Sequence, residues 1–334
     1  MKIGKMVAAV DSHTCGEPTR IIVGGAPVLK GDTMAEKWVD FKTNHDEFRR
    51  FIMTEPRGHS DMFGAILVPP VNKEADTGVI FCDTGGSLSM CGHGSIGVAS
   101  AMVNLKIVKV NEPHTVVKLD TPAGLVSIDV EVKNGEAVSA TLRNVPAFVF
   151  ADGLELHLPA LGKTVKFSIC FGGSFFAILD AADFGLSLTS KETARLVELG
   201  VMVMDEANKQ YCVQHPEIPE NNKILLAEFG LHKEGQAARN CVVFGRCNVD
   251  RSPCGTGTCA KMALLASRGE LAPNESFMHE SILGTVFEGH YEEGVTVGAY
   301  QAITPYIKGS ANIAGFNWLI EHDSDPLLPG FLLN

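Results

Sequence analysis

Two cysteines in closely similar surroundings are the residues of this chain best suited to chemistry. Cys91 begins the run Cys-Gly-His-Gly-Ser, and Cys254 begins the run Cys-Gly-Thr-Gly-Thr. In both places a polar turn precedes the cysteine, and small and apolar residues typical of a helix follow it. The free N–H groups at a helix start favour a thiolate over a thiol and also bind a carboxylate. The paired segments therefore predict two reactive thiols beside two anion-binding helix starts.

Each cysteine must be positioned by a helix and by the strands that surround that helix. The run from Ile96 to Val103 is apolar or small on all sides, so a helix there must be enclosed by other elements. The run after Cys254 is similar, with Lys261 as its main polar residue, and Gly269 is placed to cap its end. Strand-like apolar runs lead into both motifs. The sequence thus predicts two α/β lobes of related design, each with a buried central helix wrapped by strands.

Hydrophobic patterning places the remaining elements. A polar turn is expected over 11–18, between two short buried strands. Spaced apolar positions over 33–53 predict one or two amphipathic helices, and the same periodicity predicts another helix over 189–204, followed by a polar loop over 205–223. The pair Asn-Gly at Asn134 predicts a hairpin turn within a β-rich region.

Composition excludes several classes of protein. A chain of 334 residues favours two domains, and 45% hydrophobic with 20% charged residues is typical of a globular protein. The net charge of −11 argues against nucleic-acid binding, because phosphates are bound by a basic face. No apolar run approaches the about 20 residues of a membrane span, and the first residues lack the apolar segment of a secretory signal. We therefore expect a cytoplasmic protein with no nucleic-acid and no membrane partner.

The chain has nine cysteines, which raises the question of disulfides or a metal site. The odd number, the wide spacing and the absence of any Cys-x-x-Cys argue against both, so we expect no metal. Cys82, Cys170 and Cys241 each lie inside an apolar strand-like run and are expected to be reduced and buried. Cys15 and Cys259 lie close to the motif segments, and the sequence assigns them no role.

The residues around Cys91 also resemble the motifs of two other catalytic classes. The glycines from Gly92 to Gly97 match the dinucleotide-binding spacing, but the acidic residue about 20 positions further on, Glu112, lies in a polar Asn-Glu-Pro turn rather than at a strand end. Nicotinamide binding is therefore disfavoured. A cysteine hydrolase using Cys91 and His93 is also disfavoured, because neighbours two apart at a helix start do not readily place a base on the thiol. A non-catalytic small-molecule binding protein remains open.

The chain resembles the proline racemase and hydroxyproline epimerase family. The segments Met-Cys-Gly-His-Gly and Asp-Arg-Ser-Pro-Cys-Gly-Thr-Gly-Thr carry the resemblance. It extends nearly end to end, through Asp-Ser-His-Thr from Asp11, Glu-Pro-Arg-Gly-His from Glu55, Phe-Gly-Gly-Ser-Phe-Phe-Ala from Phe171 and Gly-Phe-Asn from Gly315.

The resemblance implies an α/β fold similar to diaminopimelate epimerase, with mostly antiparallel strands in two related lobes. The first lobe is expected to comprise 1–122 and 310–334 and to carry Cys91. The second lobe is expected to comprise 123–309 and to carry Cys254, with the active site between the lobes. The family also suggests a homodimer.

Inversion of an amino-acid α-carbon requires one group that removes the α-proton and another that delivers a proton to the opposite face. A thiolate and a thiol suit this task and need no cofactor. The resemblance implies that Cys91 and Cys254 are this pair. The residues that match the family's substrate-binding positions are Gly92, His93, Asp250, Gly255 and Thr256.

Among those positions, Gly92, His93, Gly255 and Thr256 match the residues whose backbone amides bind the substrate carboxylate in the family. Asp250 resembles the group that pairs with the ring nitrogen of the substrate. From the sequence alone, a turn or cap role for Asp250 is equally consistent.

Three activities compete within the family. Dehydratases of trans-3-hydroxy-L-proline carry threonine in place of the second cysteine, so Cys254 argues against that activity. Phe63 and Phe244 match the aromatic pair of the racemases. A pocket with two phenyl rings favours an unsubstituted pyrrolidine, because burying a hydroxyl without a partner costs roughly 1–3 kcal/mol. We therefore expect a cofactor-independent isomerase that interconverts L- and D-proline, with 4-hydroxyproline 2-epimerase as the alternative.

Overall fold

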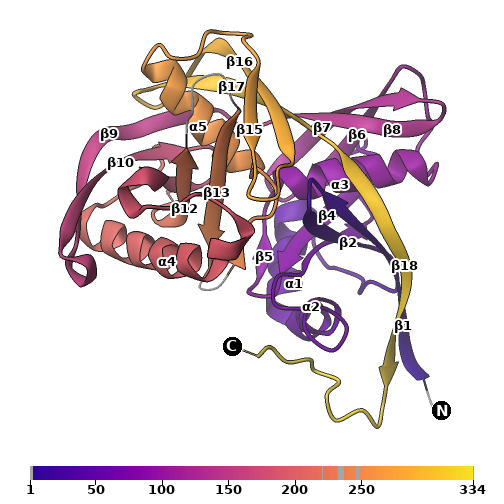
Figure 1. Cartoon of the computed structure of the whole chain (residues 1–334). Helices are drawn as coiled ribbons and strands as arrows, with labels where there is room; N and C mark the ends of the chain where they lie inside the picture. Colours follow the sequence, from indigo (N-terminus) through magenta and orange to yellow (C-terminus); the bar gives the residue numbers. More distant parts are fainter. Residues whose placement is uncertain (1–2, 220, 232–236, 246–247, 334) are drawn as a thin grey trace. The chain divides into compact units, whose positions relative to one another are not determined.

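The computed structural model describes residues 3–219, 221–231, 237–245 and 248–333. The chain divides into two compact units, Met1–Leu142 with Gly309–Asn334 and Arg143–Lys308 (Figure 1). The family resemblance implied a first boundary near 122, which lies between the strands β6 (His114–Thr121) and β7 (Gly124–Lys133). These two strands pair with each other along the whole of β6, so the chain divides after their ribbon rather than within it.

Within the described residues, the first unit holds three helices and half of the strands of the sheet. Its other strands are β1 (Ile3–Thr14), β2 (Glu17–Gly24), β3 (Phe63–Val68), β4 (Thr77–Asp83), β5 (Ser87–Leu88), β8 (Glu136–Arg143) and β18 (Ala311–His322). Its helices are α1 (Met34–Asn44), α2 (Asp46–Met53) and α3 (Gly92–Asn104). β18, β1 and β2 are antiparallel neighbours, β2–β3 and β4–β6 are parallel pairs, and β3–β4 and the β6–β7–β8 run are antiparallel. The C-terminal strand β18 thus lies beside the N-terminal strand β1.

The second unit is a ring of strands. Its strands are β9 (Ala147–Leu158), β10 (Lys163–Phe171), β11 (Phe175–Asp180), β12 (Ile224–Leu231), β13 (Ala238–Phe244), β14 (Asn248–Val249), β15 (Phe277–Glu280), β16 (Val286–Val297) and β17 (Tyr300–Gly309). Its helices are α4 (Thr193–Gln210), α5 (Gly255–Ser267) and the 3₁₀ turns Pro159–Leu161, Ala181–Phe184 and Ser190–Glu192. Pairing runs from β9 through β10, β11, β12, β13, β15 and β16 to β17, which returns to β9. Only the β11–β12 and β13–β15 pairs in this ring are parallel.

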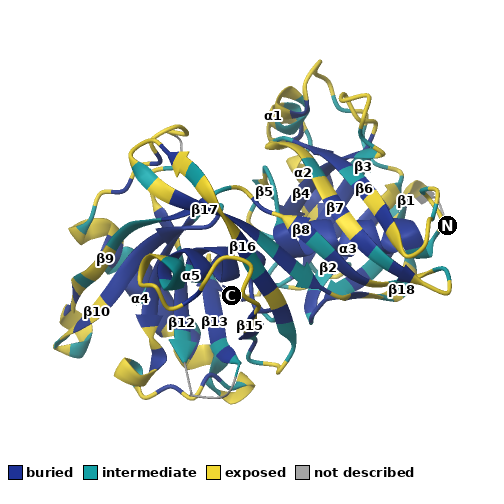
Figure 2. Ribbon diagram, turned by 90° about the horizontal axis from the view of Figure 1, so that it is seen from above, coloured by how far each residue is buried: buried dark blue, intermediate teal, exposed yellow. Residues whose placement is uncertain are grey.

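Each unit encloses one central helix, as the sequence predicted. Every residue of α3 from Gly92 to Val103 is buried, and its apolar side chains form one core with strands β2, β3, β4, β6, β7 and β8. Most of α5 is buried in the same way, with Lys261 less so (Figure 2). The expected α/β fold, with two related units of mostly antiparallel strands around a buried helix, is confirmed.

The local predictions were mostly confirmed. The amphipathic pattern over 33–53 forms α1 and α2, and the periodicity over 189–204 belongs to α4. The Asn-Gly pair turns the chain between β7 and β8, with φ of 56° at Asn134 and 78° at Gly135. A residue in the left-handed region at both central positions is the requirement of a type I′ hairpin, which explains this dipeptide.

Two boundaries were wrong. The turn expected over 11–18 is a strand as far as Thr14, because two of its polar residues point inward and are hydrogen-bonded there. The Ser12 hydroxyl donates to the Thr19 carbonyl at 3.0 Å, and the Thr14 hydroxyl donates to the His93 carbonyl at 2.9 Å. The loop expected from 205 begins only after Gln210, because Ala207 is fully buried and continues the apolar face of α4.

Candidate active site

Cys91 occupies the N-cap of α3. Its backbone is extended, with φ −147° and ψ 129°, and its sulfur accepts a hydrogen bond from the Gly94 N–H at 3.4 Å. The Nδ1 atom of His93 lies 3.2 Å from the same sulfur. The side chain is half-buried, so the thiol can be reached by a ligand. A thiolate here is stabilised by the helix start and by the neighbouring imidazole.

Phe63 packs against this helix start. Its ring centroid lies 4.5 Å from that of His93, in an edge-on arrangement. A Cβ on Gly94 would approach Phe81 to 2.8 Å and Phe63 to 3.0 Å, so only glycine lets both rings lie this close to the helix. The structure therefore gathers Cys91, Gly92, His93 and Phe63, which we call the first cysteine site.

The side chain of His93 reaches the thiol of Cys91, contrary to the prediction from their spacing. The two-residue separation of Cys91 and His93 was expected to keep the base away from the thiol, yet their sulfur and Nδ1 atoms are within 3.2 Å. The N-cap cysteine has extended backbone while His93 is already helical, and this change of backbone turns the two side chains toward each other. The cysteine hydrolase therefore has to be judged on other grounds.

Cys254 occupies the matching position at the N-cap of α5. Its sulfur accepts a hydrogen bond from the Gly257 N–H at 3.3 Å and lies 3.8 Å from the Thr256 hydroxyl. Its backbone has φ 62° and ψ 110°, in a region that a residue with a Cβ rarely adopts. Such strain costs about 1–3 kcal/mol and is concentrated at functional sites. No residue type near Cys254 indicates this backbone conformation.

The turn before Cys254 is held by Asp250. One carboxyl oxygen of Asp250 accepts hydrogen bonds from the Ser252 N–H at 2.8 Å and from the Ser252 hydroxyl at 2.7 Å. The Ser252 oxygen accepts in turn from the Cys254 N–H at 3.1 Å. The turn role that the sequence left open for Asp250 is thus present. We call Cys254, Gly255, Thr256 and Asp250 the second cysteine site.

Phe244 ends β13, the strand that leads into the second cysteine site. It is half-buried and pairs with Leu226 on β12 and with Asn248 on β14. The N–H of Asp250 donates to the carbonyl of Val242 on the same strand at 2.9 Å. The structure therefore connects Phe244 to Asp250 through the β13–β14 turn region.

The two sites differ in their electrostatic surroundings. Burial raises the pKa of the Cys254 thiol well above its ordinary value, and the charges of Asp250 and Glu228 raise it further, against hydrogen bonds from Gly257 and Thr256. Burial also raises the pKa of Glu228 to about 8. Glu228 was not predicted as a site residue, although its place inside the apolar run Ile-Leu-Leu-Ala-Glu-Phe is a signal of a buried acid.

Most of the other cysteines are buried in the core of the protein. Cys82, Cys170 and Cys241 are free and buried, as predicted. Cys15 is buried in the tight turn between β1 and β2, with φ 50°, and Cys259 is fully buried on α5. Cys212 is free and exposed, and Cys247 lies outside the described residues. In the part of the chain that the structure describes, no three His, Cys, Asp or Glu side chains are grouped to hold a metal, and no helix has the length and hydropathy to cross a membrane.

Comparison with known proteins decides the family. The proline racemase family model matches residues 9–332. The chain is 46% identical to a proline racemase of Clostridioides difficile, over 100% of both chains, and 41% identical to a 4-hydroxyproline epimerase of Brucella melitensis, over 96% of this chain and 97% of the relative. The chain belongs to the proline racemase family.

Solved structures agree with this assignment. A hydroxyproline epimerase from Agrobacterium vitis, with bound trans-4-hydroxy-L-proline, matches with a TM-score of 0.91 at 32% identity, covering 100% of this chain and 97% of the other. A probable proline racemase from Agrobacterium radiobacter, with bound carbonate, matches with a TM-score of 0.90 at 32% identity, over 98% and 96%. Members of the phenazine biosynthesis PhzF family share the fold alone, with a TM-score of 0.59 at 12% identity for the protein from Bacillus anthracis.

Membership of the proline racemase family makes this protein an isomerase of the racemase and epimerase type. The dinucleotide, hydrolase and non-catalytic interpretations of the two motifs are thereby set aside.

Proposed function

We propose that this protein interconverts L- and D-proline by two-base proton transfer through Cys91 and Cys254, without a cofactor. One observation carries the proposal. Each cysteine caps a buried helix, and each sulfur accepts an N–H of the first helical turn, at 3.4 Å for Cys91 and 3.3 Å for Cys254. A thiol in that position can release and regain a proton, because the N–H groups stabilise the thiolate.

The proton transfers balance without any further reactant. One cysteine, as thiolate, takes the α-proton and becomes a thiol, while the electron pair of the C–H bond stays on the substrate. The other cysteine, as thiol, gives its proton to the opposite face of the α-carbon and becomes a thiolate. The enzyme therefore ends each turnover with the two protonation states exchanged.

The helix starts would bind the substrate carboxylate. The N–H groups around Gly92 and His93, and those around Gly255 and Thr256, carry the partial positive charge that stabilises this group and the charge developing on the α-carbon. The carboxylate of Asp250 would pair with the ring ammonium. Its second oxygen is the one available for this, because the first holds the turn at Ser252.

Proline is the proposed substrate because Phe63 and Phe244 supply apolar surface to the two cysteine sites. Phe63 is 5% exposed and packs on His93, where a ring hydroxyl would find no partner on the phenyl group. The relative with 46% identity is a proline racemase. The alternative is 4-hydroxyproline 2-epimerase, which the name of the 41% identical relative favours. A dehydratase is disfavoured because Cys254 keeps the second base.

We also propose that the protein forms a homodimer. Phe316, Trp318 and Ile320 alternate along β18 and are 68%, 65% and 41% exposed. Alternate residues of a strand share one face, so these three side chains form a continuous apolar strip. We expect a second copy of this chain to cover the strip, because the family resemblance suggests a homodimer. Trp318→Glu should convert the dimer to a monomer in light scattering, whereas Val28→Glu, at an isolated site that is 90% exposed, should not.

The decisive assay measures the change in optical rotation that the purified protein causes in L-proline and in trans-4-hydroxy-L-proline, without added cofactor. We expect faster turnover of proline, and we expect activity to survive EDTA and borohydride. Faster turnover of trans-4-hydroxy-L-proline would select the epimerase. Activity that depends on a metal, flavin or nicotinamide would contradict the two-cysteine mechanism.

A further inference from the structure

Glu228 is a buried acid that the proposed proton transfers do not use. It lies on β12 with an exposed fraction of 0%, and neither of its carboxyl oxygens has a hydrogen-bond partner among the described residues. An unpaired carboxylate in such a place is costly, so its presence calls for an explanation. Burial raises its pKa to about 8, although the charge of Lys261 lowers it.

The carboxyl group of Glu228 lies beside the sulfur of Cys254. A Cβ on Gly257 would come within 2.8 Å of Glu228 Oε2 and within 3.2 Å of Cys254 Sγ. Both atoms therefore border the same small space, which the missing side chain leaves open, and they are no more than about 6 Å apart. At that range one charge shifts the pKa of the other.

Other ionisable groups around this pair come from several elements. Lys261 on α5 is the cation that acts on Glu228. His279 on β15 is fully buried, its Nε2 lies 3.9 Å from Glu228 Oε1, and burial lowers its pKa to about 3, so it is neutral. Burial raises the pKa of the thiols of Cys170 on β10 and Cys241 on β13, so both stay protonated. The charge of Glu228 raises the pKa of both thiols further. Asp250 adds a negative charge on the Cys254 side.

The neutral His279, which lies beside Glu228, is hydrogen-bonded to the start of α5. His279 Nδ1 lies 2.9 Å from the Thr258 hydroxyl, which donates to the Cys254 carbonyl at 2.7 Å. Thr258 is fully buried. The position of Cys254 is thus tied to β15 as well as to α5.

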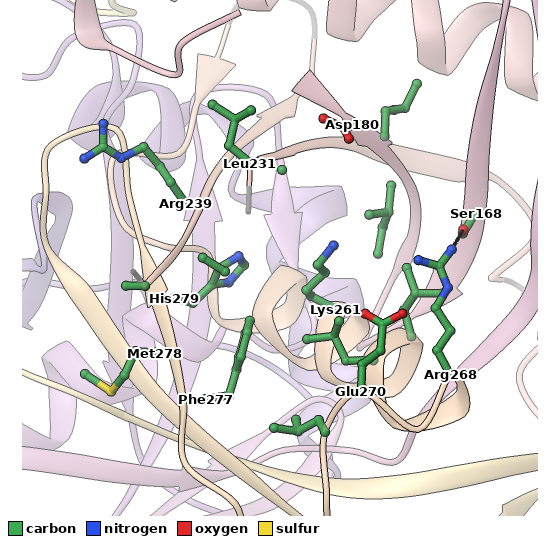
Figure 3. A pocket seen from close by; sticks show the side chains of 18 of the residues that line it. Ser168, Asp180, Leu231, Arg239, Lys261, Arg268, Glu270, Phe277, Met278 and His279 are labelled. Atoms are coloured by element: carbon green, nitrogen blue, oxygen red, sulfur yellow. Dashed lines mark hydrogen bonds between the residues drawn. The ribbon is translucent and has the colours of Figure 1, made fainter. Parts of the chain in front are cut away.

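The second unit contains a cavity of about 1040 Å³ (Figure 3). Lys261 and His279, which act on Glu228, are both in its wall, with Leu264, Phe277 and Arg239. Figure 3 shows the amine of Lys261 pointing into the cavity. The two residues that act on Glu228 therefore border a cavity, while Glu228 itself is fully buried.

We propose that Glu228 is a positioning residue that modulates the protonation of Cys254: an ionised Glu228 disfavours the thiolate of Cys254, and a neutral Glu228 makes that thiolate easier to form. Two anions this close in a buried site, faced by one lysine, share a single negative charge, as paired carboxylates do. Exchange between the two states moves one proton from sulfur to carboxylate oxygen and leaves the net charge unchanged. This inference rests on the proposed function, in which Cys254 gains and loses a proton.

The test measures the thiols directly and needs no substrate. The rate of alkylation by iodoacetamide is followed against pH for wild type and Glu228→Gln, with Cys254 and Cys91 quantified separately by peptide mass spectrometry. Removing the charge of Glu228 should lower the pH midpoint of Cys254 alkylation by about one unit or more. The midpoint of Cys91 is the internal control and should not move.

An unchanged Cys254 midpoint in a folded Glu228→Gln protein would overturn the proposal, and so would an equal shift at Cys91. If the variant does not fold, wild type still provides a test by infrared spectroscopy. A carbonyl band of a protonated buried carboxyl should be present at neutral pH and disappear under alkaline conditions, and Lys261→Met should move its disappearance to higher pH. Absence of the band at neutral pH would overturn the proposal. A Cys254 shift in a protein without racemase activity would leave the coupling standing and contradict the proposed function alone.

Discussion

Replacing Phe63 by valine should shift the enzyme toward hydroxyproline. The ring is 5% exposed and stacks edge-on against His93, with centroids 4.5 Å apart. Valine removes the outer part of this ring and leaves space beside the helix start for a hydroxyl and its water. A change of this size in an apolar pocket is worth about 1–3 kcal/mol, so kcat/KM for trans-4-hydroxy-L-proline relative to L-proline should rise about tenfold to two-hundredfold.

The assay compares initial rates of both substrates by circular dichroism. Phe41→Val is the matched control, because Phe41 is 1% exposed and belongs to a different core cluster of the same unit. It should lose stability in a similar way, by about 1–3 kcal/mol, without changing the substrate ratio. An unchanged ratio in Phe63→Val, or an equal change in Phe41→Val, would refute the apolar-wall argument. A wild type that prefers hydroxyproline would refute it too.

Three further predictions follow from the same contacts. Cys91→Ser and Cys254→Ser should each reduce racemisation by about a hundredfold or more, with unchanged thermal unfolding. The control Cys259→Ser, at a position that is also buried on α5, should keep activity. A fully active Cys91 or Cys254 variant would contradict the two-base assignment. Gly94→Ala places a Cβ 2.8 Å from Phe81 and should cost about 1–3 kcal/mol in urea unfolding, whereas Gly86→Ala, with no atom within 4 Å, should cost little; equal losses would count against the close packing. The pKa of Glu228 in the folded state, about 8, is raised above its ordinary value. The free energy of unfolding of wild type should therefore fall relative to that of Glu228→Gln as pH rises from the unfolded-state pKa to the folded-state pKa. A stability difference between the two proteins that does not depend on pH would contradict this.

The central helices could be predicted because their signal is local. A run such as Ile96–Val103 has no polar face, so it must be enclosed wherever it folds. The N-cap positions of the two cysteines follow from the turn before each helix and the glycines after each cysteine. The end of β1 could not be predicted in the same way. The hydroxyl of Thr14 finds its acceptor at His93, 79 positions along the chain, and a polar residue with so distant a partner resembles a turn residue in the sequence.

The second cysteine site illustrates the same limit. Its cysteine adopts a left-handed backbone because Ser252 and Asp250 hold the preceding turn through three hydrogen bonds. Nothing in the run of residue types distinguishes this turn from an ordinary one. Glu228, the acid near this cysteine, comes from β12. Its burial depends on β11 and β13, which pair with β12 only in the folded ring.

The two cysteines therefore share a motif but not an environment. Cys91 faces the imidazole of His93, which can stabilise a thiolate, while Cys254 faces the hydroxyl of Thr256 and the carboxyl of Glu228. A racemase must use each cysteine as a base in one direction and as an acid in the other, so neither protonation state can be strongly preferred. Burial and two nearby acids disfavour the thiolate of Cys254, and the N–H of Gly257 opposes them. A carboxyl group that takes up a proton when Cys254 loses one reduces the remaining penalty, because the buried pair never carries two negative charges. The strained turn, the missing side chain at Gly257 and the buried acid are then parts of one arrangement that lets a deeply buried thiol exchange its proton.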